Sequence, residues 1–168
     1  MSQLKVNPIV PVGGLPSGAN GGNLQVVQAV KTDQSSTNST SFVDISGLSA
    51  TITPSSNSSK VLCACSLYIS RNSGGSTTLV NFVRGSTNIG QPTGSTTTHQ
   101  ATMLIYTSAE LMHPITQVFL DSPATTSATT YKIQIGQDTS SSTTFVNRWY
   151  NSSSYHAIST LTLYEVTA

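Results

Sequence analysis

Three histidines, six acidic residues and two cysteines are the side chains of this chain with the most chemical potential. His99, His113 and His156 have no companion at the spacing of metal ligands, and none lies in a recognisable catalytic motif. We therefore expect the histidines to serve in surface, turn or packing roles. No metal site, cofactor or catalytic residue is predicted.

The acidic residues are far apart in the sequence, and most stand at strand ends or in turns: Asp33, Asp44, Glu110, Asp121, Asp138 and Glu165. Folding could still join two of them into an acid and base pair, but their spacing does not indicate one. The abundant serines include no Gly-x-Ser-x-Gly turn, and the glycine pairs lack a following helix that could hold a phosphate. These patterns predict that the protein is not an enzyme.

Cys63 and Cys65 lie in the run Val-Leu-Cys-Ala-Cys-Ser-Leu. In an extended chain both thiols point to the same face as the aliphatic residues on either side, Val61, Leu67 and Ile69. We expect them to be small buried hydrophobic residues. A metal site lacks further ligands, and two such closely spaced cysteines do not indicate a disulfide framework.

The segment Asn147-Arg148-Trp149-Tyr150-Asn151, followed by Tyr155, is the densest aromatic stretch. Sugar rings stack on such side chains, so the candidate glycan contacts are Trp149, Tyr150 and Tyr155. The alternative, which we favour, is that these aromatic residues cap one end of the fold.

Charged residues make up 8% of the 168-residue chain, and the net charge is +1. Because the basic residues are scattered, the chain shows no surface for nucleic acid or for an anionic membrane. No long apolar stretch follows Met1, so neither a signal peptide nor a membrane-spanning helix is expected. The length suits one domain.

Residues 1–22 are rich in proline and glycine, which break strand ladders and loosen the backbone. We expect an extended N-terminal arm here, followed by one folded domain over residues 23–168. Aliphatic side chains on an extended segment suit burial by a partner. The predicted partner-binding residues of the arm are Leu4, Val6, Pro8, Ile9, Val10, Pro11, Val12 and Leu15.

From Leu24 onward, short runs typical of strands alternate with polar turns, and no window has sustained helical spacing. About ten strands without helices need two packed sheets or a closed barrel. We predict an all-β fold, a jelly-roll-like antiparallel β-sandwich, with an immunoglobulin-like sandwich as the alternative. The expected strands are 24–31, 41–45, 48–53, 60–70, 78–84, 102–107, 114–121, 130–136, 143–149 and 158–166.

Three segments resemble a family of small all-β virion surface proteins of marine and freshwater tailed bacteriophages. These segments are Leu24-Gln-Val-Val-Gln-Ala-Val-Lys31, Thr40 to Pro54 continuing into Ser59-Lys60-Val61-Leu62, and Asp121 to Lys132. The resemblance implies a homotrimer on the virion surface, synthesised in the cytoplasm of the host bacterium. It also implies a role either in capsid decoration or in a tail-fibre head.

The chain contains no coiled-coil heptads that would build a fibre shaft. A capsid decoration (cement) protein, whose arm binds the major capsid protein, therefore fits the layout best. The competing interpretation is a tail-fibre or receptor-binding tip or adaptor, in which the aromatic segment contacts a host glycan and the arm joins a tail component. A polysaccharide depolymerase is the most remote interpretation, because nothing locates its acid and base.

Overall fold

The computed structural model describes residues 23–72, 75–94, 99–107 and 111–166, and in these ranges the chain forms strands, turns and loops but no helix. Consequently no helix in the described ranges could span a membrane. The predicted arm, residues 1–22, lies outside the described residues. The first strand begins at Asn23.

One layer of the fold, called sheet A here, is built around β4, which pairs antiparallel with β8 along one edge and with β13 along the other. Strand β1 adds to the free side of β13, so the order across the layer is β1-β13-β4-β8. β13 pairs with residues 60–66 of β4, and β10 pairs with residues 69–71. The short strand β2 pairs with β10. These strands are β1 (Asn23–Lys31), β2 (Ser35–Thr37), β4 (Lys60–Arg71), β8 (Met112–Asp121), β10 (Thr144–Val146) and β13 (Ser159–Val166).

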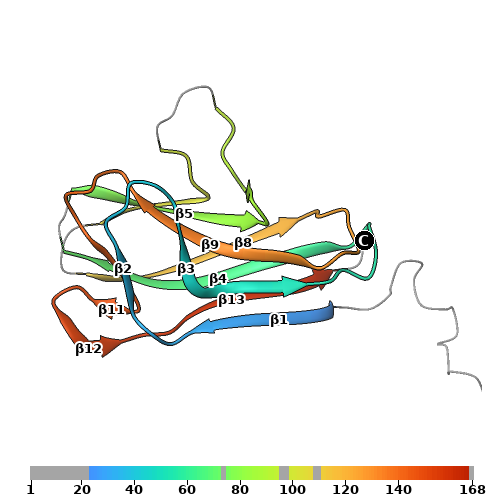
Figure 1. The fold of residues 1–168 in the computed structure, drawn as a ribbon, viewed down its shortest axis with the longest axis horizontal. Coiled ribbons are helices and arrows are strands. Elements are labelled where there is room, and N and C mark those ends of the chain that lie inside the picture. Colours follow the sequence, from blue (N-terminus) through green and yellow to red (C-terminus); the bar gives the residue numbers. More distant parts are fainter. Residues whose placement is uncertain (1–22, 73–74, 95–98, 108–110, 167–168) are drawn as a thin grey trace, which may run out of the picture.

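The second layer, sheet B, has the order β3-β9-β5, and β6 and β7 both pair with β5. All of its pairings are antiparallel. Its strands are β3 (Val43–Ile52), β5 (Ser76–Arg84), β6 (Thr87–Ile89), β7 (Met103–Thr107) and β9 (Thr129–Gln137). Figure 1 shows the two layers lying one over the other, with their strands running along the long axis of the molecule.

Eight strands alternate between the two sheets along the chain, except that β5 is followed by β7 of the same sheet: β1, β4, β8 and β13 form sheet A, and β3, β5, β7 and β9 form sheet B. Eight antiparallel strands distributed in this way over two packed sheets are a jelly roll. The predicted jelly-roll sandwich is therefore confirmed.

The core lies between the two sheets and consists mainly of aliphatic side chains from β3, β4, β5, β9 and β13. Strand β4 shows why the sequence folds this way, because its side chains alternate between buried and half-exposed along most of its length. Cys63 and Cys65 lie on its buried face together with Leu67, as their spacing predicts, and both thiols are free.

Two of the expected strand boundaries were wrong. The expected strands 41–45 and 48–53 are one strand, β3, whose register against β9 shifts between Asp44 and Ser49. Gly47 lies in this irregular stretch with a φ of +86°, a conformation that glycine adopts without steric cost. Its role is thus to bend one strand rather than to connect two.

The expected strand 143–149 is interrupted at Asn147, whose φ is +61°. The chain leaves sheet A there and forms a separate two-stranded hairpin, β11 (Arg148–Trp149) and β12 (Ser152–His156). Because Asn tolerates left-handed backbone better than most residues, a strand can end at this position.

We predict that neither cysteine of the folded protein reacts with a thiol reagent such as Ellman's reagent at pH 8. Cys63 and Cys65 are 0% and 1% exposed, and burial raises the pKa of each thiol to about 12. Absorbance should report no reaction in buffer and two thiols per chain in denaturant. Rapid modification of the native protein would contradict the buried placement.

Candidate functional site

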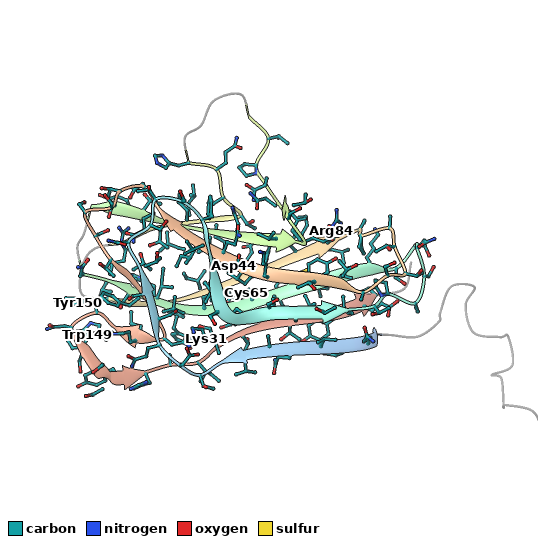
Figure 2. All side chains as sticks on the ribbon, in the orientation of Figure 1. Lys31, Asp44, Cys65, Arg84, Trp149 and Tyr150 are labelled. Atoms are coloured by element: carbon teal, nitrogen blue, oxygen red, sulfur yellow. The ribbon has the colours of Figure 1, made fainter. Side chains whose placement is uncertain are left out.

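The hairpin of β11 and β12 brings together the three aromatic residues that the sequence singles out. The Trp149 ring meets Tyr150 at a centroid distance of 5.7 Å and Tyr155 at 5.5 Å, both edge to face. Trp149, Tyr155 and Met112 line a shallow, almost wholly apolar hollow of about 300 Å³. Figure 2 shows Trp149 and Tyr150 at one end of the molecule, and Figure 1 places the hairpin there beside the sandwich.

Asn147 holds the hairpin against the sandwich. Its side-chain amide donates hydrogen bonds to the backbone oxygens of Lys31 (2.8 Å) and Asp33 (3.1 Å), and its Oδ1 accepts one from Ser159 Oγ (2.5 Å). Its backbone N–H donates to Tyr68 O, and its carbonyl accepts from a residue beyond the hairpin. The side chain is fully buried, so these bonds satisfy every polar group of the residue.

Further contacts fix the two strands of the hairpin. Ser70 Oγ donates to the backbone oxygen of Arg148 at 2.7 Å, which ties β11 to the end of β4. The Arg148 guanidinium stacks over the Phe145 ring at 4.5 Å. On the far strand, Gln34 Nε2 donates to Ser153 O at 3.0 Å and lies 2.9 Å from a ring nitrogen of His156.

The structure does not bring the three histidines into one site with other metal-binding side chains. His99 lies in the connection between β6 and β7, His113 near the start of β8, and His156 at the end of β12. No cluster of three or more His, Cys, Asp and Glu side chains that could hold a metal ion occurs within the described ranges.

Each acidic side chain in the described ranges forms an ion pair or accepts a hydrogen bond from another residue of the fold. Asp33 pairs with Lys31, and Asp44 pairs with Lys132 at 2.8 Å. Hydrogen bonds from Lys132 and then Gln134 lower the pKa of Asp44, which keeps it ionised. Asp138 accepts from the Thr77 N–H and Glu165 from Ser55, while Glu110 lies outside the described residues.

The structure contains two buried polar clusters that the sequence did not predict. Asp121 accepts hydrogen bonds from Arg84 and from the Tyr131 hydroxyl, both at 2.7 Å, and closes one end of the sandwich. Burial, followed by this bond to Asp121, raises the pKa of Tyr131. The Arg71 guanidinium lies buried among polar side chains that include Gln137 at 3.1 Å. Because Arg84 lies 37 residues from Asp121 and Gln137 lies 66 residues from Arg71 in the sequence, no local pattern predicts these two clusters.

The outward side of sheet A is a second surface of interest, and we call it the uncharged face. The four strands stand in register across it, so that Val26, Tyr164, Leu62 and Leu120 form one row. Two further rows run parallel to this one. The face consists of Val26, Gln28, Val30, Leu62, Ala64, Ser66, Tyr68, Pro114, Thr116, Val118, Leu120, Thr160, Thr162 and Tyr164.

The outward side of sheet B differs in two respects. It carries the ion pair of Asp44 with Lys132 across β3 and β9. In addition, Gln91 and Thr102 of the connection between β6 and β7 lie against β5. Asn81 Oδ1 of β5 accepts hydrogen bonds from Gln91 Nε2 and from the Thr102 N–H, each at 3.1 Å. The two sides of the sandwich are therefore chemically unequal. The fourteen positions of the uncharged face carry no charged side chain, and Lys60, exposed at the start of β4, lies beyond them at one end of the same side.

Among solved structures, the chain is similar to those of T=1 particles derived from infectious bursal virus (14% identity, TM-score 0.48) and of the Gx strain of infectious bursal disease virus (15% identity, TM-score 0.47). Both matches cover 100% of this chain and, respectively, 41% and 42% of the other chain. The chain thus spans about two fifths of the length of the viral proteins that it matches.

No family model matches the sequence. A search of curated proteins found no match either. The resemblance to tailed-phage proteins therefore stays a prediction.

We predict that Asn147→Ala lowers the free energy of unfolding by about 3 kcal/mol, because it removes three side-chain hydrogen bonds, two of them to the buried Lys31 and Ser159, and places Ala at a left-handed φ. Urea denaturation measures the change. Asn151→Ala, at an exposed turn of the same hairpin, is the matched control and should change stability by no more than about 0.5 kcal/mol. Equal stability of both variants would show that Asn147 is not the anchor.

Proposed function

We propose that this protein is a non-enzymatic structural component of a virion, made in the cytoplasm of a host bacterium and assembled on the particle surface. The observation that carries the proposal is the uncharged face. Its exposed valines and leucines suit burial by protein rather than contact with water, because exposed apolar side chains that gather on one face mark association surfaces. The sequence resemblance to virion surface proteins of tailed bacteriophages supports the same role.

Within this class we favour a trimeric capsid decoration protein. The N-terminal segment 1–22 attaches it to the major capsid protein by burying aliphatic side chains such as Val6, Ile9 and Val12. Each could contribute about 1 kcal/mol or more before the cost of ordering the segment. Three segments on one trimer act together, because docking of the first raises the effective concentration of the others.

The chemistry of the described side chains supports a role without catalysis. Carboxylates that act as acid and base need freedom to exchange protons with a substrate, whereas Asp121 and Glu165 accept hydrogen bonds that hold the scaffold together. A depolymerase therefore gains no support from their placement.

The aromatic hollow favours a second candidate, a tail-fibre or receptor-binding tip or adaptor. The indole of Trp149 and the ring of Tyr155, which is 62% exposed, offer an apolar wall for the face of a sugar ring. In this alternative the hairpin contacts a surface glycan of the host, and segment 1–22 joins a tail component.

We predict that a chain lacking residues 1–22 no longer binds particles of the parent virus that have been stripped of this protein, because it has lost its attachment segment. Co-sedimentation followed by cryo-electron microscopy measures occupancy and shows whether the density covers shell or tail. A full-length variant with Ile9, Val10 and Val12 changed to Asp should show the same loss.

Trp149→Ala is the control, and it should bind the particle at full occupancy. Full occupancy by the truncated chain would show that the sandwich, not segment 1–22, is the anchor. Density on the tail, together with loss of host adsorption on Trp149→Ala, would instead establish the receptor-binding alternative.

A further inference from the structure

The aromatic hollow beside the hairpin of β11 and β12 leaves apolar side chains uncovered. Its lining residues, Met112, Trp149 and Tyr155, come from the start of β8 and from both strands of the hairpin. Tyr155 is 62% exposed, and Leu111, the residue before Met112, is 53% exposed. Apolar side chains that gather around a concave surface mark a binding site. The hollow therefore suits an occupant that is itself apolar.

The chemistry of the walls favours a proline-rich segment over a sugar. The hydroxyls of a sugar need hydrogen-bond partners, and the almost wholly apolar lining of this hollow offers them few. Proline rings carry no hydroxyl, and grooves lined by aromatic side chains bind them in extended polyproline segments. The hollow, at about 300 Å³, lies at the lower end of the range for ligand pockets, which suits a few proline and aliphatic side chains.

The chain itself contains a segment of this kind outside the described residues. Residues 6–22 carry no charged side chain and include the run Pro8-Ile-Val-Pro11. In a polyproline II helix, which has about three residues per turn, Pro8 and Pro11 stand on the same side. Both rings can then face one aromatic surface, such as the one that Trp149 and Tyr155 form.

The segment is long enough to reach the hollow of its own chain. Strand β1 begins at Asn23, and its other end lies beside the hairpin, because Lys31 O accepts from the Asn147 amide at 2.8 Å (Figure 1). The two ends of β1 are roughly 26 Å apart at about 3.3 Å per residue. Pro11 precedes Asn23 by twelve positions, which span roughly 37 Å in polyproline II geometry. The run Asn20-Gly21-Gly22 favours the reversal of direction that this path needs.

We propose that the aromatic hollow is a proline-binding site and that residues 8–11 of the same chain occupy it in the free protein. The covalent connection keeps the segment at a high effective concentration, with which a separate ligand must compete. This inference goes beyond the proposed function, since it concerns the protein before it attaches to a particle. Attachment through segment 1–22 then requires residues 8–11 to leave the hollow, so the hollow and the capsid protein compete for the same side chains.

Fluorescence of the full-length chain tests the occupancy, because Trp149 is its single tryptophan. A variant with Pro8→Asp and Pro11→Asp carries two charges that an apolar hollow excludes. We expect its emission to shift to longer wavelength, and acrylamide to quench it more strongly than in the wild type. Pro16→Asp with Ser17→Asp is the matched control, which adds the same two charges outside the run and should leave the spectrum unchanged. Circular dichroism checks that each variant is folded.

A peptide added to the charged variant tests the site itself. A synthetic peptide of residues 4–15 should reverse the emission shift of the Pro8→Asp and Pro11→Asp variant and reach saturation. The same peptide with both prolines changed to Asp should have no effect. Adding Tyr155→Ala to the protein should abolish the response, because this change removes one wall of the hollow and keeps Trp149 as the reporter.

Photo-crosslinking identifies the copy that supplies the segment. With p-benzoylphenylalanine in place of Val10, irradiation should give a product with the mass of one chain on a denaturing gel. Mass spectrometry should place the link at Met112 or Tyr155. Products with the mass of two chains or more would show that a neighbouring copy supplies the segment, and they would overturn the same-chain site.

Two further results would also overturn the proposal. Equal spectra of the wild type and the Pro8→Asp and Pro11→Asp variant, or equal shifts in this variant and its control, would show that the two prolines do not cover Trp149. A response to host surface polysaccharide without any response to the peptide would assign the hollow to a glycan. These measurements use no virus particles, so the proline site can fail while attachment to the particle succeeds, and the reverse.

Discussion

The alternation of side chains along β4 is the constraint on which the rest of the structure depends. This strand lies in the middle of sheet A, with β13 on one side and β8 on the other. Because successive side chains point to opposite faces, the residues that fill the core leave their neighbours to form the outward surface. A shift of one residue in the register would exchange the two sets, so the core and the uncharged face stabilise the same register.

The jelly roll joins its strands by long connections, and buried polar side chains secure the places where these connections meet. Asn147 bonds to the ends of β1 and β13 and to β4 at the point where the chain leaves sheet A for the hairpin. At the other end, Asp121 receives Arg84 from β5 and Tyr131 from β9. The Asn147 cluster joins strands of sheet A, whereas the Asp121 cluster links the two sheets, and in both an unsatisfied polar group would cost stability.

The aromatic hollow and the uncharged face are neighbours in the structure. Ser70, at the end of β4, holds the hairpin, and Met112, at the start of β8, lines the aromatic hollow. Sheet A thus presents the uncharged face along its length and the hollow at one end. A partner that buried the uncharged face would leave the hairpin accessible at one end of the sandwich, where a glycan or a neighbouring subunit could reach it.

The sequence by itself determined the fold class and most strands, because a period of two and the polar turns are local signals. It predicted the buried thiols of β4 and the gathering of the aromatic residues near Trp149 for the same reason. Only the tertiary structure decided that one strand, Val43–Ile52, replaces the two expected between residues 41 and 53, since the shift in register near Gly47 depends on pairing with β9. Likewise, Asn147 and Asp121 each find partners far away in the sequence, such as Lys31 and Arg84, 116 and 37 residues away. The uncharged face exists only when β1, β13, β4 and β8 come into register, and that pairing joins the first and last strands of the described residues.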